Sequence, residues 1–270
     1  MMSKECRDTA IKQADKAEST VILRAGERLD DLQCRGYYII QNPNVFCFGM
    51  DAVLLADFTA GKPKAQVMDL GTGTGVIPML MEARNKGMHY TGLEIQEYSA
   101  DMARRSVLYN HLEEKIDIIQ GDIREVPCTY KAASFDIVTS NPPYIKGSHG
   151  LENPEEPKNI ARHEVKLSLE DVVHAAAHLL REGGTFSMVH KPFRLAEIIR
   201  LLSAYRLEPK RLCMVQPYAD KEPNMVLIEA VKGGNPMIKI EPALIVYNRD
   251  GSYTEDLLKR YGEHHERKKL

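Results

Sequence analysis

The sequence contains no tryptophan, no closely spaced cysteine pair and no long apolar run. Its five cysteines are odd in number and widely spread, and none stands in a C-x-x-C pair. That pattern argues against a disulfide framework or a zinc site and favours reduced structural thiols. No segment approaches the roughly 18 consecutive apolar residues of a membrane-spanning helix, and the charged stretch 1–18 has no apolar signal core. We therefore predict a cytoplasmic protein that does not enter a membrane.

A strong excess of one charge is also absent, because the formal net charge is −2. No global field therefore draws the chain to nucleic acid, and local clusters matter more than the sum. Two clusters are basic, 190–211 and the tail Arg267-Lys268-Lys269; each is either a solvated surface or a phosphate contact. The pair His163-Glu164 does not complete an H-E-x-x-H metal motif, because Leu167 stands at the second His position. We predict no metal.

At 270 residues the chain is long enough for one sizeable α/β domain with appendages. We predict four segments. They are a polar arm (1–26), a hairpin and helix extension (27–61), the main domain (62–235) and a C-terminal extension (236–270). In the second segment we expect a hairpin over 31–43 and a helix over 51–58 with Asp51 as its cap.

From residue 62 onward, short apolar runs alternate with amphipathic segments, which is typical of a parallel sheet covered by helices. The expected strands are 66–70, 90–94, 116–120, 135–140, 184–189, 209–216 and 225–231. The expected helices are 76–85, 96–110, 169–181 and 195–203. The stretch 146–158 has glycine, proline and charge without an apolar period, so we expect a long loop there.

The most conspicuous loop is Asp69-Leu70-Gly71-Thr72-Gly73-Thr74-Gly75, which ends a strand and opens a helix. Sheets of this class bind nucleotide-like ligands at that position, and glycines let a ligand lie against bare backbone. A dinucleotide site needs G-x-G-x-x-G, but Val76 occupies the last glycine's place. The D-x-G-x-G-x-G spacing resembles the first motif of class I methyltransferases. This resemblance implies that Asp69, Gly71, Thr72, Gly73 and Gly75 bind S-adenosylmethionine.

Two further acids follow strands. Glu94, beside Ile95, can accept hydrogen bonds from both ribose hydroxyls of a nucleotide-like cofactor. Asp122, beside Ile123, follows the third strand, and the likeness to methyltransferases implies a contact with the adenine amino group. A plain capping role for Asp122 is the alternative. We predict that these four residues bind the cofactor.

The fourth strand runs directly into Asn141-Pro142-Pro143-Tyr144. A conjugated amino nitrogen is a weak nucleophile because its lone pair is delocalised. The side-chain oxygen of Asn141 and the carbonyl of Pro142 can accept its two hydrogens and localise the lone pair toward a methyl donor. Tyr144 can stack on the planar substrate. We predict these three residues to be catalytic, with Asn141 also beside the cofactor and no nucleophilic side chain or dedicated base.

The two motifs together resemble amino-methyltransferases that act on adenine N6 or on release-factor glutamine. A likeness over most of the chain is to bacterial valine-tRNA adenine-N6 methyltransferases. The similar stretches are Glu27-Arg28-Leu29-Asp30-Asp31-Leu32, Phe46-Cys47-Phe48-Gly49-Met50-Asp51-Ala52-Val53-Leu54-Leu55 and Pro242-Ala243-Leu244-Ile245-Val246-Tyr247. Release-factor enzymes carry a helical N-terminal domain where this chain has a hairpin, which disfavours that substrate.

This resemblance implies a seven-stranded, mostly parallel sheet with helices on both faces, and a tRNA substrate methylated on the adenosine beside the anticodon. It also implies that Phe48 and Asp51 lie over the cofactor's methionine end. Lys191, Phe193 and Arg194 follow the fifth strand and can hold tRNA, unless they form an ordinary loop into a helix. Methylation of release-factor glutamine, of DNA or of ribosomal RNA, and binding without turnover, are the alternatives. The sequence indicates no obligate protein partner.

Overall fold

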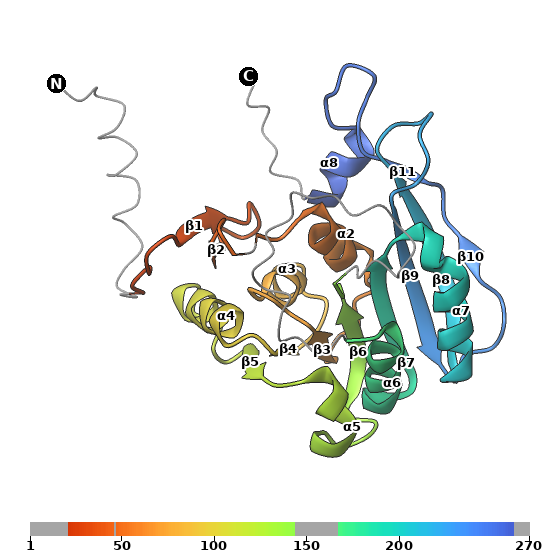
Figure 1. The fold of residues 1–270 in the computed structure, drawn as a ribbon, viewed down its shortest axis with the longest axis horizontal. Helices are drawn as coiled ribbons and strands as arrows, with labels where there is room; N and C mark the ends of the chain where they lie inside the picture. The colour runs from red at the N-terminus through yellow and green to blue at the C-terminus, as the bar shows by residue number, and fades with distance from the viewer. Residues whose placement is uncertain (1–20, 46, 144–166, 262–270) are drawn as a thin grey trace.

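The computed structural model describes residues 21–45, 47–143 and 167–261 (Figure 1). Several predictions lie outside these residues. They are the stacking role of Tyr144, the long loop 146–158, the rejected metal motif at His163-Glu164, the basic tail 267–269 and most of the polar arm.

A nine-stranded sheet forms the centre of the molecule, in the order β10-β8-β9-β7-β6-β3-β4-β5, with β11 also paired to β8. Its strands are β3 (Gln66–Leu70), β4 (His89–Glu94), β5 (Ile116–Gln120), β6 (Phe135–Ser140), β7 (Leu180–His190), β8 (Leu207–Gln216), β9 (Met225–Lys232), β10 (Lys239–Ile240) and β11 (Leu244–Ile245). Only β9 runs antiparallel to its neighbours. The predicted seven strands are confirmed, and the C-terminal extension adds two short ones.

Helices cover both faces of this sheet (Figure 1). They are α2 (Met50–Phe58), α3 (Val76–Ala83), α4 (Glu97–Tyr109), α5 (Val126–Thr129), α6 (Leu169–Leu179), α7 (Leu195–Ala204) and α8 (Glu255–Tyr261), with 3₁₀ turns η1 (Ile123–Glu125) and η2 (Pro192–Arg194). One apolar core joins α2 and α3 to the sheet, and the other joins α6 and α7 to it. Parallel strands buried on both faces explain the nearly continuous apolar runs in the sequence.

Several predicted features are wrong in detail. The helix expected to reach Arg181 ends at Leu179, because Leu180 already pairs with Phe135 and begins β7. The hairpin expected over 31–43 uses earlier residues for its first strand: β1 is Arg28–Asp31 and β2 is Tyr38–Gln41.

Asp51 is also not the helix cap. Helix α2 begins one residue earlier than predicted, and Gly49 is its N-cap. Asp51 lies in the first turn, where its Oδ1 accepts the N–H of Ala52 at 2.9 Å. A Cβ on Gly49 would come within 2.8 Å of Asp51 Oδ1, so a glycine lets the carboxylate fold back over the helix start.

The N-terminal extension is attached to α4 by buried polar contacts. Arg105 donates two hydrogen bonds to Glu27, at 2.7 and 2.8 Å, and the Glu27 side chain is fully buried. These bonds lower the pKa of Glu27 to about 2. In β2, Ile40 N–H donates to Ser106 Oγ at 2.9 Å and Tyr38 N–H donates to Asn110 Oδ1 at 2.8 Å. The hairpin therefore has a fixed position on the main domain.

The C-terminal extension packs against α2. Arg84 of the α3 end donates to the carbonyl of Arg260 at 2.8 Å, and Arg260 pairs with Asp57 at 3.1 Å. Earlier in the extension, the Tyr247 ring stacks on Tyr253 with centroids 5.4 Å apart. The extension therefore contacts helix α2 through α8 and pairs with β8 through β10 and β11.

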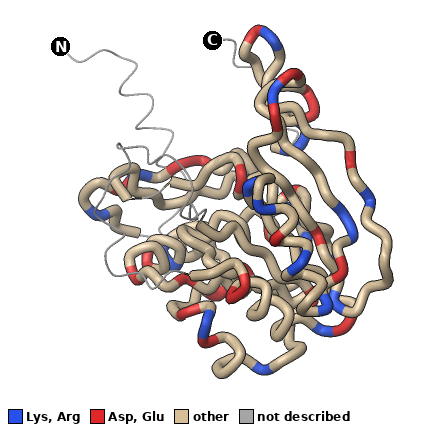
Figure 2. The backbone as a smooth tube through the Cα atoms, turned by 45° about the vertical axis from the view of Figure 1, so that its right-hand side comes forward, with Lys and Arg blue, Asp and Glu red and all other residues tan. Residues whose placement is uncertain are grey.

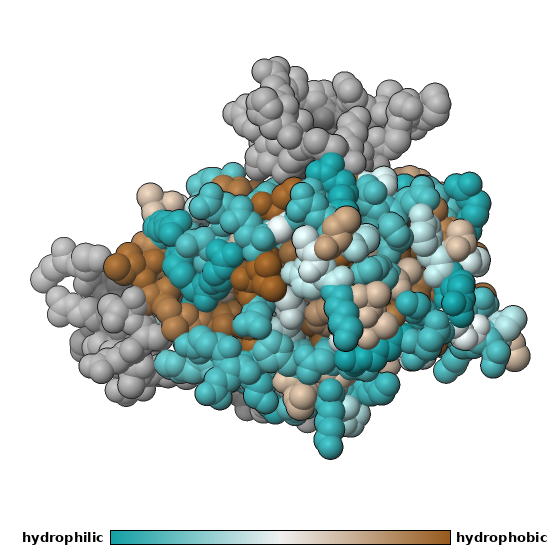
Figure 3. Space-filling view, turned by 90° about the horizontal axis from the view of Figure 1, so that it is seen from below, coloured by the Kyte–Doolittle hydropathy of each residue, from teal (hydrophilic) through white to brown (hydrophobic). Residues whose placement is uncertain are grey.

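The surface carries charges of both signs. Figure 2 shows basic and acidic residues interspersed along the described chain. The face in Figure 3 is largely hydrophilic, with apolar side chains in patches between polar ones, as is usual for a folded surface. In the described ranges no helix is both long and apolar enough to cross a membrane.

Candidate functional site

The sheet topology brings the predicted site residues to one edge. Strands β3 to β7 run parallel, so their carboxyl ends meet at the same edge. Asp69 and Glu94 lie in the last residues of β3 and β4, and Gly71, Asp122, Asn141 and Lys191 follow the ends of β3, β5, β6 and β7. This edge is where an open α/β sheet forms its ligand crevice.

The glycine loop has a backbone conformation that residues other than glycine rarely adopt. Gly71, Gly73 and Gly75 have φ values of 75°, 58° and 84°. The N–H groups of Gly71 and Thr72 both donate to the carbonyl of Leu93, at 2.9 and 3.0 Å, which fastens the loop to β4. A Cβ on Gly75 would lie 3.2 Å from the Cβ of Ala103. The backbone conformation therefore favours glycine at all three positions, and tight packing against Ala103 favours it further at Gly75.

Asp69 and the loop threonines carry unused hydrogen-bonding capacity. Asp69 is 1% exposed, and its Oδ1 accepts from Thr139 Oγ1 at 2.7 Å. Its Oδ2 and the hydroxyls of Thr72 and Thr74 make no hydrogen bond of good geometry within the described part of the chain, although the Thr72 hydroxyl is close enough to Asp69 to favour its ionised form. Buried polar atoms are costly when left unpaired, so this cluster is suited to a polar ligand. The ammonium and hydroxyl groups of S-adenosylmethionine are donors of the kind that this acceptor-rich cluster fits.

Glu94 is held in place by the loop itself. Its Oε2 accepts the N–H of Gly73 at 2.8 Å, and its Oε1 accepts the N–H of Gln96 at 2.9 Å. Each carboxylate oxygen can accept a second hydrogen bond, so the geometry remains compatible with ribose hydroxyls. The neighbouring Ile95 is 50% exposed, which leaves an apolar side chain at the same edge.

Asp122 has the capping role that the sequence left as an alternative. It is the N-cap of η1, where its Oδ1 accepts the N–H of Arg124 at 2.9 Å. The guanidinium of Arg124 also donates to it, and these bonds hold the pKa of Asp122 below its usual value. Ile123 Cδ1 lies 3.8 Å from the Cβ position of Gly71. The turn is therefore next to the glycine loop, while adenine recognition by Asp122 stays a prediction.

Phe48 and Asp51 lie at the start of α2, a helix that packs against α3 directly after the glycine loop. The N–H of Phe48 donates to Gln41 Oε1 at 2.9 Å, so the segment is connected to β2. Both side chains are partly exposed. Their contact with the cofactor stays a prediction.

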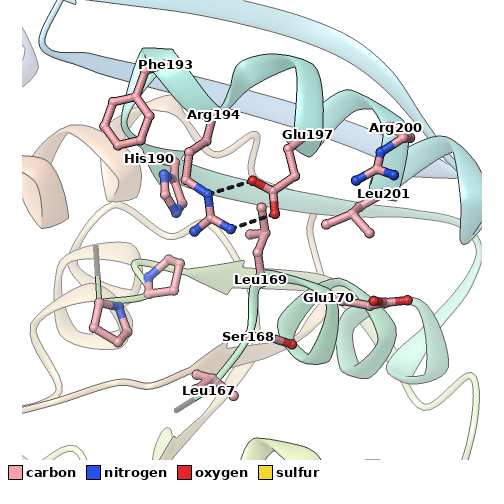
Figure 4. A pocket seen from close by; sticks show the side chains of 12 residues that line it. Leu167, Ser168, Leu169, Glu170, His190, Phe193, Arg194, Glu197, Arg200 and Leu201 are labelled. Carbon is pink, nitrogen blue, oxygen red and sulfur yellow. Dashed lines mark hydrogen bonds and ion pairs between the residues drawn. The ribbon is translucent and has the colours of Figure 1, made fainter. Parts of the chain in front are cut away.

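The Asn-Pro-Pro turn is connected to the glycine loop through β6. Ser140 Oγ donates to the carbonyl of Leu70 at 2.8 Å, one residue after the Thr139–Asp69 bond. Asn141 is partly buried, Pro142 is buried and Pro143 is exposed. The two prolines border a pocket of about 600 Å³ (Figure 4). The residue predicted to receive the methyl acceptor is thus adjacent to both the loop and a cavity.

Three polar side chains of the pocket come from the end of β7 and the segment after it. Arg194 donates to both carboxylate oxygens of Glu197, at 2.8 and 2.7 Å, as Figure 4 shows. His190 is 1% exposed, and its Nδ1 accepts the N–H of Lys191 at 2.7 Å. Burial lowers the pKa of His190 to about 4, so the ring is neutral at physiological pH. Lys191, Phe193 and Arg194 were predicted from the sequence as tRNA contacts, whereas His190 and Glu197 were not. His190 directly follows the predicted strand 184–189 and is the last residue of the observed β7.

Cofactor-free Asp69→Asn should be more stable than the natural protein at neutral pH. Burial raises the pKa of Asp69 from 3.8 to about 6. The ionised carboxylate therefore destabilises the folded state above pH 6, and that penalty disappears as the pH falls through 6 toward 3.8. The difference corresponds to about 3 kcal/mol above pH 6. Thermal unfolding between pH 7.5 and 4.5 should show a gain in Tm that shrinks with acidification.

Asp220 supplies a control because its carboxylate is exposed. Asp220→Asn removes a negative charge that carries no desolvation penalty. Its Tm should follow that of the natural protein at each pH. A gain for Asp69→Asn that does not vary with pH would show that the buried carboxylate is not its source.

A metal site is not evident in this region. Within residues 21–45, 47–143 and 167–261, no group of three or more His, Cys, Asp or Glu side chains could hold a metal ion.

Comparison with known proteins identifies relatives of the whole chain. The family model described as methyltransferase small domain matches residues 36–205. A tRNA1(Val) (adenine(37)-N6)-methyltransferase from Porphyromonas gingivalis is 32% identical over 187 residues, covering 67% of this chain and 72% of that protein. A protein of the same name from Tolumonas auensis is 26% identical over 223 residues, covering 82% of this chain and 91% of that protein.

Two solved structures share the fold. A predicted O-methyltransferase from Agrobacterium tumefaciens has a TM-score of 0.63 at 24% identity, covering 78% of this chain and 95% of that one. TYW2 from Pyrococcus horikoshii, solved in complex with MeSAdo, has a TM-score of 0.57 at 13% identity, covering 79% and 74% of the two chains.

Proposed function

Because the chain belongs to the methyltransferase small-domain family, and within it to the tRNA1(Val) (adenine(37)-N6)-methyltransferases, we propose that it methylates the N6 amino group of a tRNA adenosine beside the anticodon. The cofactor is S-adenosylmethionine. The observation that carries this proposal is the connection of Asn141 to the glycine loop, through Thr139–Asp69 and Ser140–Leu70 at the end of β6.

S-Adenosylmethionine supplies an electrophilic methyl group on a sulfonium. The chain's own part is to bind and orient the acceptor. The Asn141 oxygen and the Pro142 carbonyl accept the two N6 hydrogens and localise the nitrogen lone pair, an interaction that is worth most in the transition state. Pro143 directly after it restricts ψ of the buried Pro142 and so the direction of the Pro142 carbonyl. Stacking by Tyr144 belongs to the same proposal.

No dedicated base is needed in this mechanism. The N6 nitrogen becomes strongly acidic once it is methylated and can then release its proton to water. His190 lines the pocket as a neutral ring at physiological pH, because burial lowers its pKa to about 4.

The target adenosine must be accessible in a loop or unstacked, since a base inside a stem cannot reach the site. An anticodon loop meets this requirement. A tRNA substrate also implies work in the cytoplasm. The N-terminal hairpin stands where release-factor enzymes carry a helical domain, which disfavours glutamine as the acceptor.

The test is an assay with labelled S-adenosylmethionine and four separate acceptors: unmodified tRNA, a release factor, DNA and ribosomal RNA. We expect N6-methyladenosine in the tRNA alone after nuclease digestion and nucleoside chromatography. A tRNA transcript with guanosine in place of the adenosine beside the anticodon should take up no label. Label on glutamine, on DNA or on ribosomal RNA would refute the proposed substrate.

A further inference from the structure

A ligand-sized space lies beside the proposed adenine clamp. The pocket of about 600 Å³ is bordered by Pro142 and Pro143 and continues along the start of α6 and the first turns of α7. Pockets that enclose small ligands have volumes of about 300–1,000 Å³. The start of α6 is rigid, because Ser168 and Asp171 exchange hydrogen bonds in a capping box. The pocket therefore has defined walls on two sides.

An aromatic ring stands at the edge of this pocket. Phe193, in η2, is 75% exposed, and Figure 4 shows it beside His190 and Arg194. Unstacked bases in single-stranded RNA stack on such rings, and the contact tolerates any base because every base has a π-face. Phe193 therefore offers a stacking surface close to the clamp.

The charged groups of the pocket favour a base over a phosphate. Arg194 is neutralised by Glu197, and Glu170 accepts the hydroxyl of Tyr205 at 2.9 Å. The formal charges of the lining residues balance, since Arg194 and Arg200 face two glutamates. A pocket without net charge selects by stacking and hydrogen bonding more than by attraction to a polyanion.

Arg200 adds donors to this pocket. It lines the cavity and is exposed, and it makes no hydrogen bond or ion pair with the residues that the structure describes. A guanidinium presents five N–H donors and matches the acceptor-rich edges of bases and the ribose hydroxyls.

We infer that this pocket binds the nucleotide adjacent to the target adenosine, with Phe193 stacked on its base and Arg200 donating to its edge or ribose. The inference rests on the proposed RNA substrate and extends it to a second base. When the target base leaves the loop, it loses the stacking energy with its neighbours. An adjacent base that stacks on Phe193 offsets part of this lost stacking energy. The same contact makes methylation depend on the nucleotide next to the target.

The experiment pairs a protein change with an RNA change. Natural protein and Phe193→Ala are assayed on an intact tRNA transcript and on transcripts with an abasic nucleotide on the 5′ or the 3′ side of the target. Base stacking on an aromatic side chain corresponds to about 5- to 150-fold in affinity. We expect one of the two abasic positions to raise KM by that amount for the natural protein and to have little further effect in Phe193→Ala.

Two control variants distinguish the loss of base stacking from a general effect on the fold. Phe193→Tyr keeps an aromatic face and should retain the natural KM. Ile240→Ala removes another exposed apolar side chain, which lies in β10 at the end of the strand order and does not line the pocket, and should change nothing. In all three variants kcat and the affinity for S-adenosylmethionine should stay close to the natural values.

The outcomes distinguish this inference from the proposed function. Methylation of intact tRNA by the natural protein tests the function alone, and its absence would overturn the function and this inference together. Methylation with additive effects of Phe193→Ala and both abasic positions would overturn this inference and leave the function in place. A non-additive effect at one position supports the inference and identifies the side on which the neighbour lies.

Discussion

Asn141→Ala should abolish most turnover while leaving cofactor binding intact. The side-chain oxygen contributes mainly when the amino nitrogen becomes tetrahedral, so its loss raises the barrier of the chemical step more than it weakens substrate binding. Removing one preorganised hydrogen-bonding group that acts on developing charge reduces kcat by on the order of 10²–10³-fold. Steady-state kinetics with tRNA measures the loss, and calorimetric titration measures the affinity for S-adenosylmethionine.

The surrounding bonds should keep the variant folded. Ser140 and Thr139 fix the end of β6 through Leu70 and Asp69, and neither bond involves the Asn141 side chain. Asn235→Ala is the matched control, because Asn235 is exposed beyond the end of β9 at the opposite edge of the sheet. Full activity of Asn141→Ala would contradict the clamp mechanism, and an equal loss in both variants would assign the effect to the fold.

Patterns local in the sequence predicted most of the fold. The strands β3 to β9 and the larger helices have clear periodicity and are bounded by glycine, proline or a cap, so their existence could be predicted. Helix ends were less certain. The helix expected to run to residue 85 ends at Ala83, and the one expected to reach Arg181 ends at Leu179. A strand that begins directly after a helix has no punctuating residue, which explains the second error.

The unpredicted parts depend on contacts between distant residues. The two-residue strands β10 and β11 exist because β8 supplies their hydrogen bonds, and no local pattern marks them. The Glu27–Arg105 bonds join residues 78 apart in the chain.

The candidate site also has a part that local sequence patterns predict and a part that depends on contacts between distant residues. The glycine loop and Asn141 could be predicted from motifs, because each strand end is local. The pocket wall could not, because His190, Glu197 and Arg200 come together with Pro142 only after β6 and β7 pair and α7 packs beside them. Spacing alone does not show that a helix face lines a cavity.

Gly73→Val should abolish binding of S-adenosylmethionine. Gly73 has a φ of 58°, a conformation that a β-branched residue adopts only with strain, and its N–H donates to Glu94 at 2.8 Å. Valine would disturb the loop conformation and that bond at once, and it would place a branched side chain where the proposed ligand meets bare backbone. We expect a loss of affinity of at least about 100-fold, which corresponds to about 2.7 kcal/mol.

Gly183 provides a control with the same backbone requirement. Its φ is 76°, and an added Cβ would meet nothing within 4 Å. Gly183→Val should therefore lose stability through backbone strain alone and still bind the cofactor, which calorimetric titration and thermal unfolding of both variants would establish. If Gly73→Val bound S-adenosylmethionine with unchanged affinity, the glycine loop would not be the cofactor site. If both variants lost binding, strain in the fold, and not contact with the ligand, would account for the effect, because the two glycines share their conformation and differ in their position relative to the sheet edge.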